Sequence, residues 1–89
     1  MNRRLVTSGS FEKKLQLFIK KYPDLEKRIS RVLILLSGDP FSLLLKTHKL
    51  SGKLSNLFAC SIDYHYRIVF YFDEQNVFLL NIGSHDEVY

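Results

Sequence analysis

Two apolar runs, separated by four polar residues, make up the segment Ile68-Val69-Phe70-Tyr71-Phe72-Asp73-Glu74-Gln75-Asn76-Val77-Phe78-Leu79-Leu80. Aromatic and β-branched residues are frequent in both runs, which is typical of β-strands. The polar stretch 73–76 has the length and residue types of a hairpin loop. The segment therefore predicts two antiparallel strands that share an apolar face.

Strand-like composition already begins near Leu57 and continues to Gly83. Within this stretch, a first break falls near Tyr64 and a second falls in the polar loop 73–76. Three strands therefore fit residues 57–83. They predict an antiparallel meander that forms most of one sheet.

The first quarter of the chain carries a helical pattern. A short strand is expected at residues 3–7, and the turn Ser8-Gly9-Ser10 supplies an oxygen that can cap a helix. Apolar residues then recur at spacings of four, three and four, as on one face of a helix: Phe11, Leu15, Phe18 and Tyr22.

Pro23 interrupts this pattern and suits the first turn of a second helix. That helix is expected to run to about Ser37, and residues 38–40 end it. Its apolar stripe consists of Leu25, Ile29, Val32, Leu33 and Leu36. The sequence thus predicts one α+β domain, residues 1–89, in which an N-terminal strand and an antiparallel helix hairpin pack on a small, mainly antiparallel sheet (order β-α-α-β-β-β).

The composition is that of an ordinary soluble globular protein, with 46% apolar and 25% charged residues. The formal charge of +4 suits an anionic partner, although a small excess of lysine also occurs in proteins that have none. The longest aliphatic run, 32–36, is too short to cross a bilayer, and no signal peptide is recognisable. These features predict a cytoplasmic protein without a membrane partner.

Cys60 is the single cysteine, so it cannot form a disulfide within the chain. Because it lies in an apolar strand pattern, we expect a small buried side chain, with a catalytic thiol as the alternative. The sequence has no phosphate-binding glycine loop and no cluster with the spacing of metal ligands. Any catalysis is therefore expected to need neither a metal nor another cofactor.

Basic residues gather in the segment Lys46-Thr47-His48-Lys49-Leu50-Ser51-Gly52-Lys53. Lysines on a flexible, glycine-containing backbone can neutralise the phosphates of a ligand, which indicates a binding loop. Three lysines on a connecting loop are also typical of a surface that is merely solvated. The segment alone leaves both interpretations open.

His65 and Arg67 have the same parity, so a regular strand would project them from one face with Asp63 as a neighbour. The Arg67 guanidinium can hold two phosphate oxygens in a fork and stabilise charge on a reacting phosphoryl group. The alternative is an ordinary ion pair with a carboxylate.

His85 follows the last strand, where its imidazole is expected to stay solvated and to titrate near neutral pH. A side chain in that environment can carry protons, although many surface histidines have no such role. Tyr89, at the end of the sequence, can stack on a nucleobase or pack against the edge of the core.

Three blocks carry a similarity to known proteins: 48–52 (HKLSG), 60–70 (CSIDYHYRIVF) and 82–89 (IGSHDEVY). With them the chain resembles the RelE/ParE toxin superfamily, and within it the YafQ-like and RelE-like mRNA interferases of bacterial type II toxin–antitoxin systems. The β-α-α-β-β-β layout of that family agrees with the one expected here. The resemblance implies a toxin that cuts mRNA in the ribosomal A site by attack of the RNA's own 2′-hydroxyl group.

The resemblance also implies roles for single residues. His85 matches the C-terminal family histidine that carries protons, His48 matches a histidine of the YafQ-like branch, and Arg67 matches the arginine that contacts the scissile phosphate. Some relatives have a glutamate base near the position of His65, so the assignment of base and acid among the three histidines stays open. By the same resemblance Tyr89 orients the nucleotide, and the RNA backbone is bound by Lys46, Lys49 and Lys53.

The implied partners are mRNA, the ribosome and a cognate antitoxin, with operator DNA bound only through the toxin–antitoxin complex. Two other functions share the same fold. A ParE-like toxin would inhibit DNA gyrase without cutting RNA, and an inactive toxin would serve only as an antitoxin-binding module. The nuclease is favoured by the presence of four residues that gyrase inhibition does not need: His48, His65, Arg67 and His85.

Overall fold

The computed structural model of the chain describes residues 2–50 and 56–88. Strands, α-helices and short 3₁₀ turns (η) follow one another in the order β1 (Arg4–Val6), α1 (Gly9–Lys21), η1 (Pro23–Leu25), α2 (Glu26–Gly38), η2 (Leu43–Leu45), β2 (His48–Lys49), β3 (Phe58–Ser61), β4 (Tyr66–Phe72), β5 (Asn76–Ser84) and α3 (His85–Val88).

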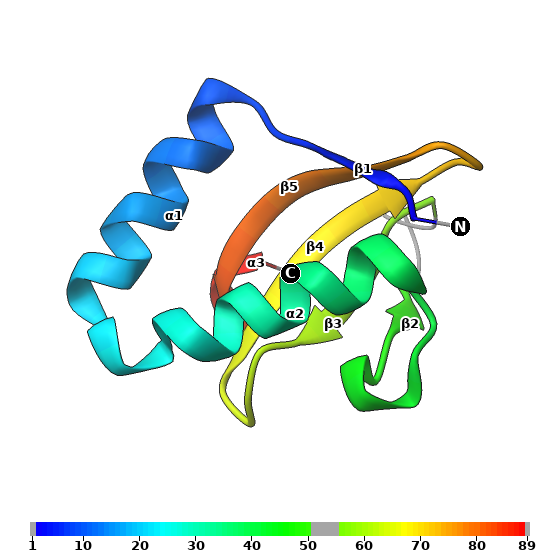
Figure 1. Cartoon of the computed structure of the whole chain (residues 1–89). Coiled ribbons are helices and arrows are strands. Elements are labelled where there is room, and N and C mark those ends of the chain that lie inside the picture. The colour runs from blue at the N-terminus through cyan, green and yellow to red at the C-terminus, as the bar shows by residue number, and fades with distance from the viewer. Residues whose placement is uncertain (1, 51–55, 89) are drawn as a thin grey trace.

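The strands form one five-stranded sheet in the order β1-β5-β4-β3-β2. β1 pairs with β5 in parallel, and the other neighbours are antiparallel. Figure 1 shows the long β4–β5 pair curving through the middle of the molecule, with α1 and α2 beside it. The predicted fold class, an N-terminal strand and two helices on a mainly antiparallel sheet, is confirmed.

The β4–β5 hairpin is fixed by the side chain of Asp73. Its Oδ1 accepts hydrogen bonds from the backbone N–H groups of Gln75 (2.8 Å) and Asn76 (2.7 Å). A short side chain that binds the backbone two and three residues later closes a tight turn. The predicted hairpin loop is therefore confirmed, with the difference that the last polar residue, Asn76, already belongs to β5.

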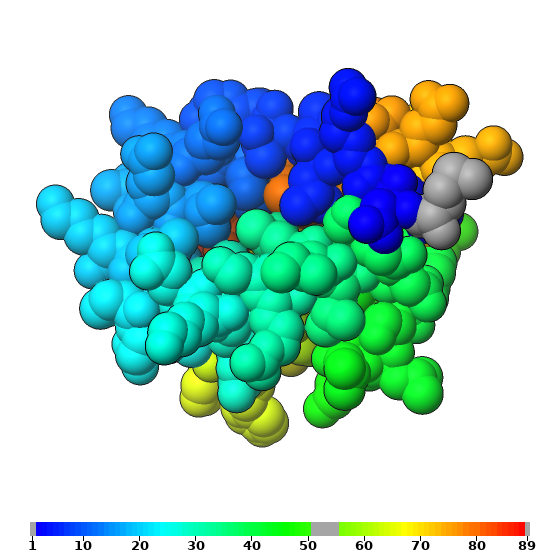
Figure 2. Space-filling model, viewed as in Figure 1, coloured from blue at the N-terminus to red at the C-terminus, as the bar shows by residue number. Residues whose placement is uncertain are grey.

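The two helices bury the apolar residues that the spacing predicts. The Ser8 hydroxyl caps α1 by accepting a hydrogen bond from the N–H of Phe11 (3.1 Å). Phe11 and Phe18 of α1 and Ile29, Val32 and Leu36 of α2 are buried in one core with the sheet. In Figure 1 the helices meet at an open angle, and Figure 2 shows that they and the segment after α2 cover most of this side of the molecule.

A smaller apolar cluster lies on the other face of the sheet, which we call the second face. It consists of Leu50, Ala59, Val69 and Val88, with Leu57 packed against it. Because successive strand residues point to opposite faces, Ile68 and Phe70 join the helix-side core while Val69 joins this cluster. The second face is thus packed by residues outside α1 and α2.

Two short elements that carry candidate residues were not predicted. Residues 46–53 were expected to be a loop, but His48 and Lys49 form β2, an edge strand whose register places His48 opposite Ala59. The strand exit at 84–89 contains α3, a helix of one turn. Both are shorter than the windows in which periodicity can be recognised. No helix among the described residues is long and apolar enough to span a membrane.

Candidate functional site

Strand pairing places Arg67 and His48 on the second face. Arg67 lies opposite Ser61 of β3 on one side and Gly83 of β5 on the other. Directly paired residues of antiparallel strands project to the same face, and Arg67 shares its parity with Val69. His48 reaches this face through its pairing with Ala59, which in turn pairs with Val69.

The guanidinium of Arg67 is held by the backbone of the turn that precedes β4. Its Nη1 donates to the carbonyl oxygens of Asp63 (2.7 Å), Tyr66 (3.1 Å) and Tyr64 (3.2 Å). In the described part of the chain, no carboxylate forms an ion pair with Arg67, and no acceptor contacts Nε or Nη2. The group is therefore oriented by one nitrogen and retains donors for an anion.

The expected row of Asp63, His65 and Arg67 on one strand face is wrong. β4 begins only at Tyr66, so Asp63 and His65 lie in the preceding turn. The Asp63 carboxylate accepts from the backbone N–H groups of His65 and Tyr66, both at 2.9 Å. Aspartate often closes turns in this way, and here that tendency prevails over strand alternation.

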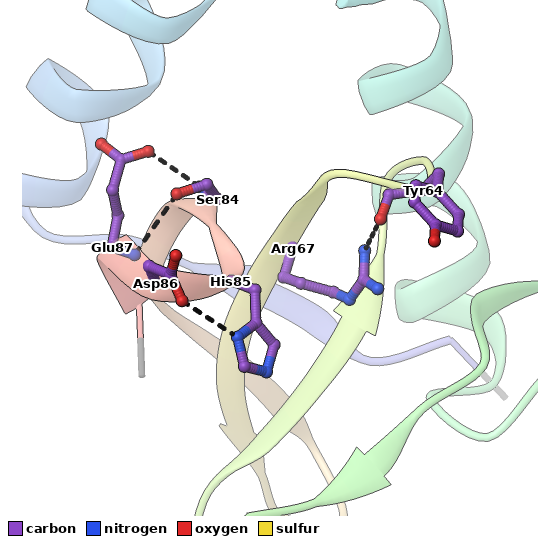
Figure 3. A network of polar contacts seen from close by, with 6 residues as sticks. All are labelled: Tyr64, Arg67, Ser84, His85, Asp86 and Glu87. Atoms are coloured by element: carbon purple, nitrogen blue, oxygen red, sulfur yellow. Dashed lines mark hydrogen bonds and ion pairs between the residues drawn. The ribbon is translucent and has the colours of Figure 1, made fainter.

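His85 is positioned by a capping box at the start of α3. The N–H of Ser84 donates to Glu87 Oε1 (2.9 Å), and the N–H of Glu87 donates to Ser84 Oγ (3.3 Å). His85 is the first residue of this turn, and its Nδ1 lies 3.6 Å from Asp86 Oδ1 (Figure 3). The pattern Ser-x-x-Glu at 84–87 is a sequence signal for the start of α3, which the expectation of a plain strand exit did not include.

Gly83 allows α3 to fold back on β5. A methyl group at this buried glycine would lie 3.2 Å from Cβ of Glu87 and 3.4 Å from Cγ1 of Val88. These distances are shorter than most carbon–carbon contacts in proteins. The absence of a side chain at Gly83 therefore lets α3 fold back so that Val88 packs with Val69 on the second face.

His65 and His85 line the same surface hollow, of about 380 Å³, together with Tyr64, Tyr66, Ser84 and Asp86. Arg67 lines a neighbouring hollow, and Tyr64 belongs to both. In Figure 3 the guanidinium of Arg67 lies between the rings of His85 and Tyr64. The turn before β4 and the end of β5 thus place His65 and His85 in one hollow, next to the hollow of the backbone-held Arg67 guanidinium.

The remaining predicted site residues are more scattered. His48 is two strands away from β4, which corresponds to roughly 10 Å between backbones. Lys46 lines the hollow of Arg67, and Lys49 is exposed on β2. Lys53 and Tyr89 lie outside the described residues. Within residues 2–50 and 56–88, no group of three histidine, cysteine, aspartate or glutamate side chains could hold a metal ion.

The Cys60 thiol and the Tyr66 hydroxyl are both in their neutral form at neutral pH. Burial raises the pKa of the Cys60 thiol to about 12, which agrees with a small buried residue and not with a catalytic thiolate. A hydrogen bond with the Tyr22 side chain raises the pKa of Tyr66 to about 12. The Tyr66 ring packs against Phe18 and Tyr22 at centroid distances of 5.1 and 4.8 Å. Tyr66 therefore forms a wall of the hollow and stays protonated at neutral pH.

The capping box predicts a pH dependence of α3. Hydrogen bonds from Ser84 lower the pKa of Glu87 below its ordinary value of 4.5. A carboxyl with a lowered folded-state pKa stabilises the fold above its unfolded-state pKa and loses that effect as the pH falls through the folded-state pKa. We expect the Ser84 amide resonance in ¹H–¹⁵N spectra to move with a midpoint below pH 4.5.

The control for this titration is Glu87→Gln, which can keep the capping geometry but has no carboxyl to titrate. In that variant the Ser84 amide resonance should not move in the same pH range. A wild-type midpoint at or above 4.5, or the same movement in Glu87→Gln, would contradict the role of Glu87 in holding α3.

Comparison with known proteins identifies the family. Residues 3–89 match the family model described as the bacterial toxin of type II toxin–antitoxin system, YafQ. No curated protein sequence matches the chain. The family match covers almost the entire chain, including all the described site residues.

Solved structures agree with this match. The chain is similar to a metal-bound toxin from Helicobacter pylori, with 29% identity, full coverage of both chains and a TM-score of 0.78. It also resembles YafQ in the Escherichia coli DinJ–YafQ toxin–antitoxin complex (16% identity, coverage of 100% and 99%, TM-score 0.82). A YoeB/ParE toxin from Agrobacterium tumefaciens shares the fold at 19% identity, coverage of 92% and 98%, and a TM-score of 0.77. The chain therefore belongs to the YafQ family of bacterial type II toxin–antitoxin toxins, as its resemblance to the RelE/ParE superfamily predicted.

Proposed function

We propose that this toxin is an endoribonuclease that cuts mRNA on the ribosome. The observation that carries the proposal is the hollow shared by His65 and His85 beside the backbone-held guanidinium of Arg67. Two histidines near a fixed cation supply what phosphodiester cleavage requires, which is a base, an acid and a donor to the charged phosphate. The alternatives, gyrase inhibition and antitoxin binding without catalysis, require none of these groups.

The proposed reaction uses the 2′-hydroxyl group of the RNA as nucleophile. A base takes the proton of this hydroxyl, the 2′-oxygen bonds to the adjacent phosphorus, and the bond from phosphorus to the 5′-oxygen breaks. An acid then gives a proton to the leaving 5′-oxygen. The products are a 2′,3′-cyclic phosphate and a 5′-hydroxyl end, and the proposal assigns no metal to any step.

The residue roles follow from position. Arg67 would hold the phosphate oxygens with its remaining donors and stabilise the charge of the transition state. His65 and His85 would exchange protons with the two reacting oxygens, because they line one hollow. General acid and base groups each contribute roughly 100- to 10,000-fold to a rate. His48 would act from β2 on the neighbouring RNA, and Tyr89 would orient a nucleotide.

The proposed partners follow from the family and from charge. Lys46 and Lys49, with Lys53, would contact phosphates of mRNA or ribosomal RNA. The related YafQ forms a complex with DinJ, so we expect a cognate antitoxin to bind this chain as well. Operator DNA would be bound only through that complex. Action on translating ribosomes would place the protein in the cytoplasm.

The deciding experiment adds purified protein to a reconstituted translation reaction and maps mRNA 5′ ends by primer extension. New ends within the codon in the ribosomal A site are expected, and they should be absent when the mRNA is incubated without ribosomes. Intact mRNA with normal protein synthesis would reject the nuclease. A DNA damage response in cells that express the protein would then support gyrase as the target.

A further inference from the structure

The hollow beside Arg67 collects positive charge from three separate elements. Arg28 of α2, Lys46 after η2 and Arg67 of β4 all line it. Arg28 and Lys46 are exposed, so their charged ends are available to a ligand. Arg28 lies on the helix side of the chain and was not among the residues singled out from the sequence.

The acidic residue that lines this hollow is Asp63. Its Oδ1 accepts hydrogen bonds from the backbone N–H groups of His65 and Tyr66, and no lysine or arginine of the described residues forms a salt bridge with it. Three cations against one engaged carboxylate leave the hollow positive. A surface of this kind attracts phosphate groups.

An exposed aromatic ring stands between this hollow and the one that holds His65 and His85. Tyr64 lines both, and the residue is 88% exposed. Its backbone is fixed, because its carbonyl accepts from Arg67 Nη1 and the turn around it is closed by Asp63. The ring of His65 meets it edge-on at 5.2 Å between centroids. Leu44, which is 76% exposed, adds a second apolar surface to the Arg67 hollow.

We propose that the hollow lined by Arg28, Lys46 and Tyr64 binds the nucleotide next to the one that is cut. The phosphate of this nucleotide pairs with Arg28 and Lys46, and its base stacks on the ring of Tyr64, with Leu44 on the wall. Arg67, which binds the reacting phosphate in the proposed mechanism, lines the same hollow, so the two nucleotides would be adjacent there. This inference rests on the proposed nuclease function and assigns its RNA a second subsite.

The test uses a trinucleotide that cannot be cut, 2′-O-methylated tri-adenylate, titrated into ¹⁵N-labelled full-length protein. The amide resonances of Arg28, Lys46 and Tyr64 are expected to shift together. Base stacking on an aromatic side chain is worth roughly 5- to 150-fold in affinity, so Tyr64→Ala should weaken binding by that factor. Tyr64→Phe retains the ring and should stay within about twofold of wild type.

Salt dependence tests the phosphate contact. Each phosphate neutralised in a single strand contributes a slope of about 0.7 to the fall of log affinity with log salt. Arg28→Ala should reduce the slope by about that amount. Lys27→Ala removes the same charge from the adjacent residue of α2, which does not line the hollow, and should leave the slope unchanged.

Several results would overturn the subsite. They are the absence of shifts at these three amides in the wild type, equal affinities for Tyr64→Ala and Tyr64→Phe, or equal salt slopes for Arg28→Ala and Lys27→Ala. Because the probe tests binding and not cleavage, the two proposals fail separately. If binding depends on the Tyr64 ring but the protein leaves mRNA intact, the subsite stands and the nuclease is rejected. If the protein cuts mRNA but Tyr64→Ala and Tyr64→Phe bind the trinucleotide equally well, the nuclease stands and the subsite is rejected.

Discussion

Replacing His85 with alanine is expected to lower the rate of mRNA cleavage by roughly 100- to 10,000-fold, because a proton donor or acceptor would be lost from the transition state. The side chain is 64% exposed, so its removal leaves no cavity in the core. The fold should therefore be kept, which a thermal unfolding curve can check. The measurement is the rate at which A-site cuts appear in primer extension under single-turnover conditions.

Alanine variants of the other two histidines show whether the loss of cleavage rate is specific to the hollow lined by His65 and His85. His65→Ala should also slow cleavage strongly, because His65 lines the hollow of His85. His48→Ala should have a smaller effect, since β2 lies two strands from β4. If His48→Ala abolishes cleavage while His65→Ala cuts at the wild-type rate, the pair that exchanges protons is His48 with His85. Near-wild-type cutting by His85→Ala would remove His85 from the mechanism.

Local patterns predicted most of the fold. The β4–β5 hairpin and the apolar stripes of α1 and α2 are each encoded by residues close together in sequence, so their periodicity and turn chemistry were sufficient. The same holds for the cap at Ser8, whose partner is only three residues away. The family resemblance and the α+β class rested on these elements and on three short sequence blocks.

The candidate site was less predictable because it depends on where short elements end. A regular strand through 63–67 was expected, yet the Asp63 carboxylate binds the backbone and delays β4 until Tyr66. That turn also supplies two of the carbonyl oxygens that hold Arg67. The presence of His65 and His85 in one hollow needs the register of β4 with β5, together with the close approach at Gly83. No periodic signal in the sequence specifies such contacts.

Arg67 offers the second large effect, because its role depends on shape as well as charge. Nη1 donates to three carbonyl oxygens, while Nε and Nη2 have no acceptor among the described residues. Lysine keeps the charge but has a single nitrogen, which cannot bind the carbonyls and fork onto a phosphate at the same time. We expect Arg67→Lys to lose roughly 100- to 1,000-fold in cleavage rate, as for other losses of a fixed transition-state donor.

Comparison of two Arg67 variants with a control at Arg28 separates the contributions of charge and geometry. If the fixed fork stabilises the transition state, Arg67→Lys and Arg67→Ala should both lose most of the rate at saturating ribosome concentration. Arg28→Lys, at an exposed position that the backbone does not hold, should keep most of its activity. If Arg67→Lys cleaves at close to the wild-type rate, charge alone is sufficient. The three carbonyl contacts would then serve only to stabilise the turn.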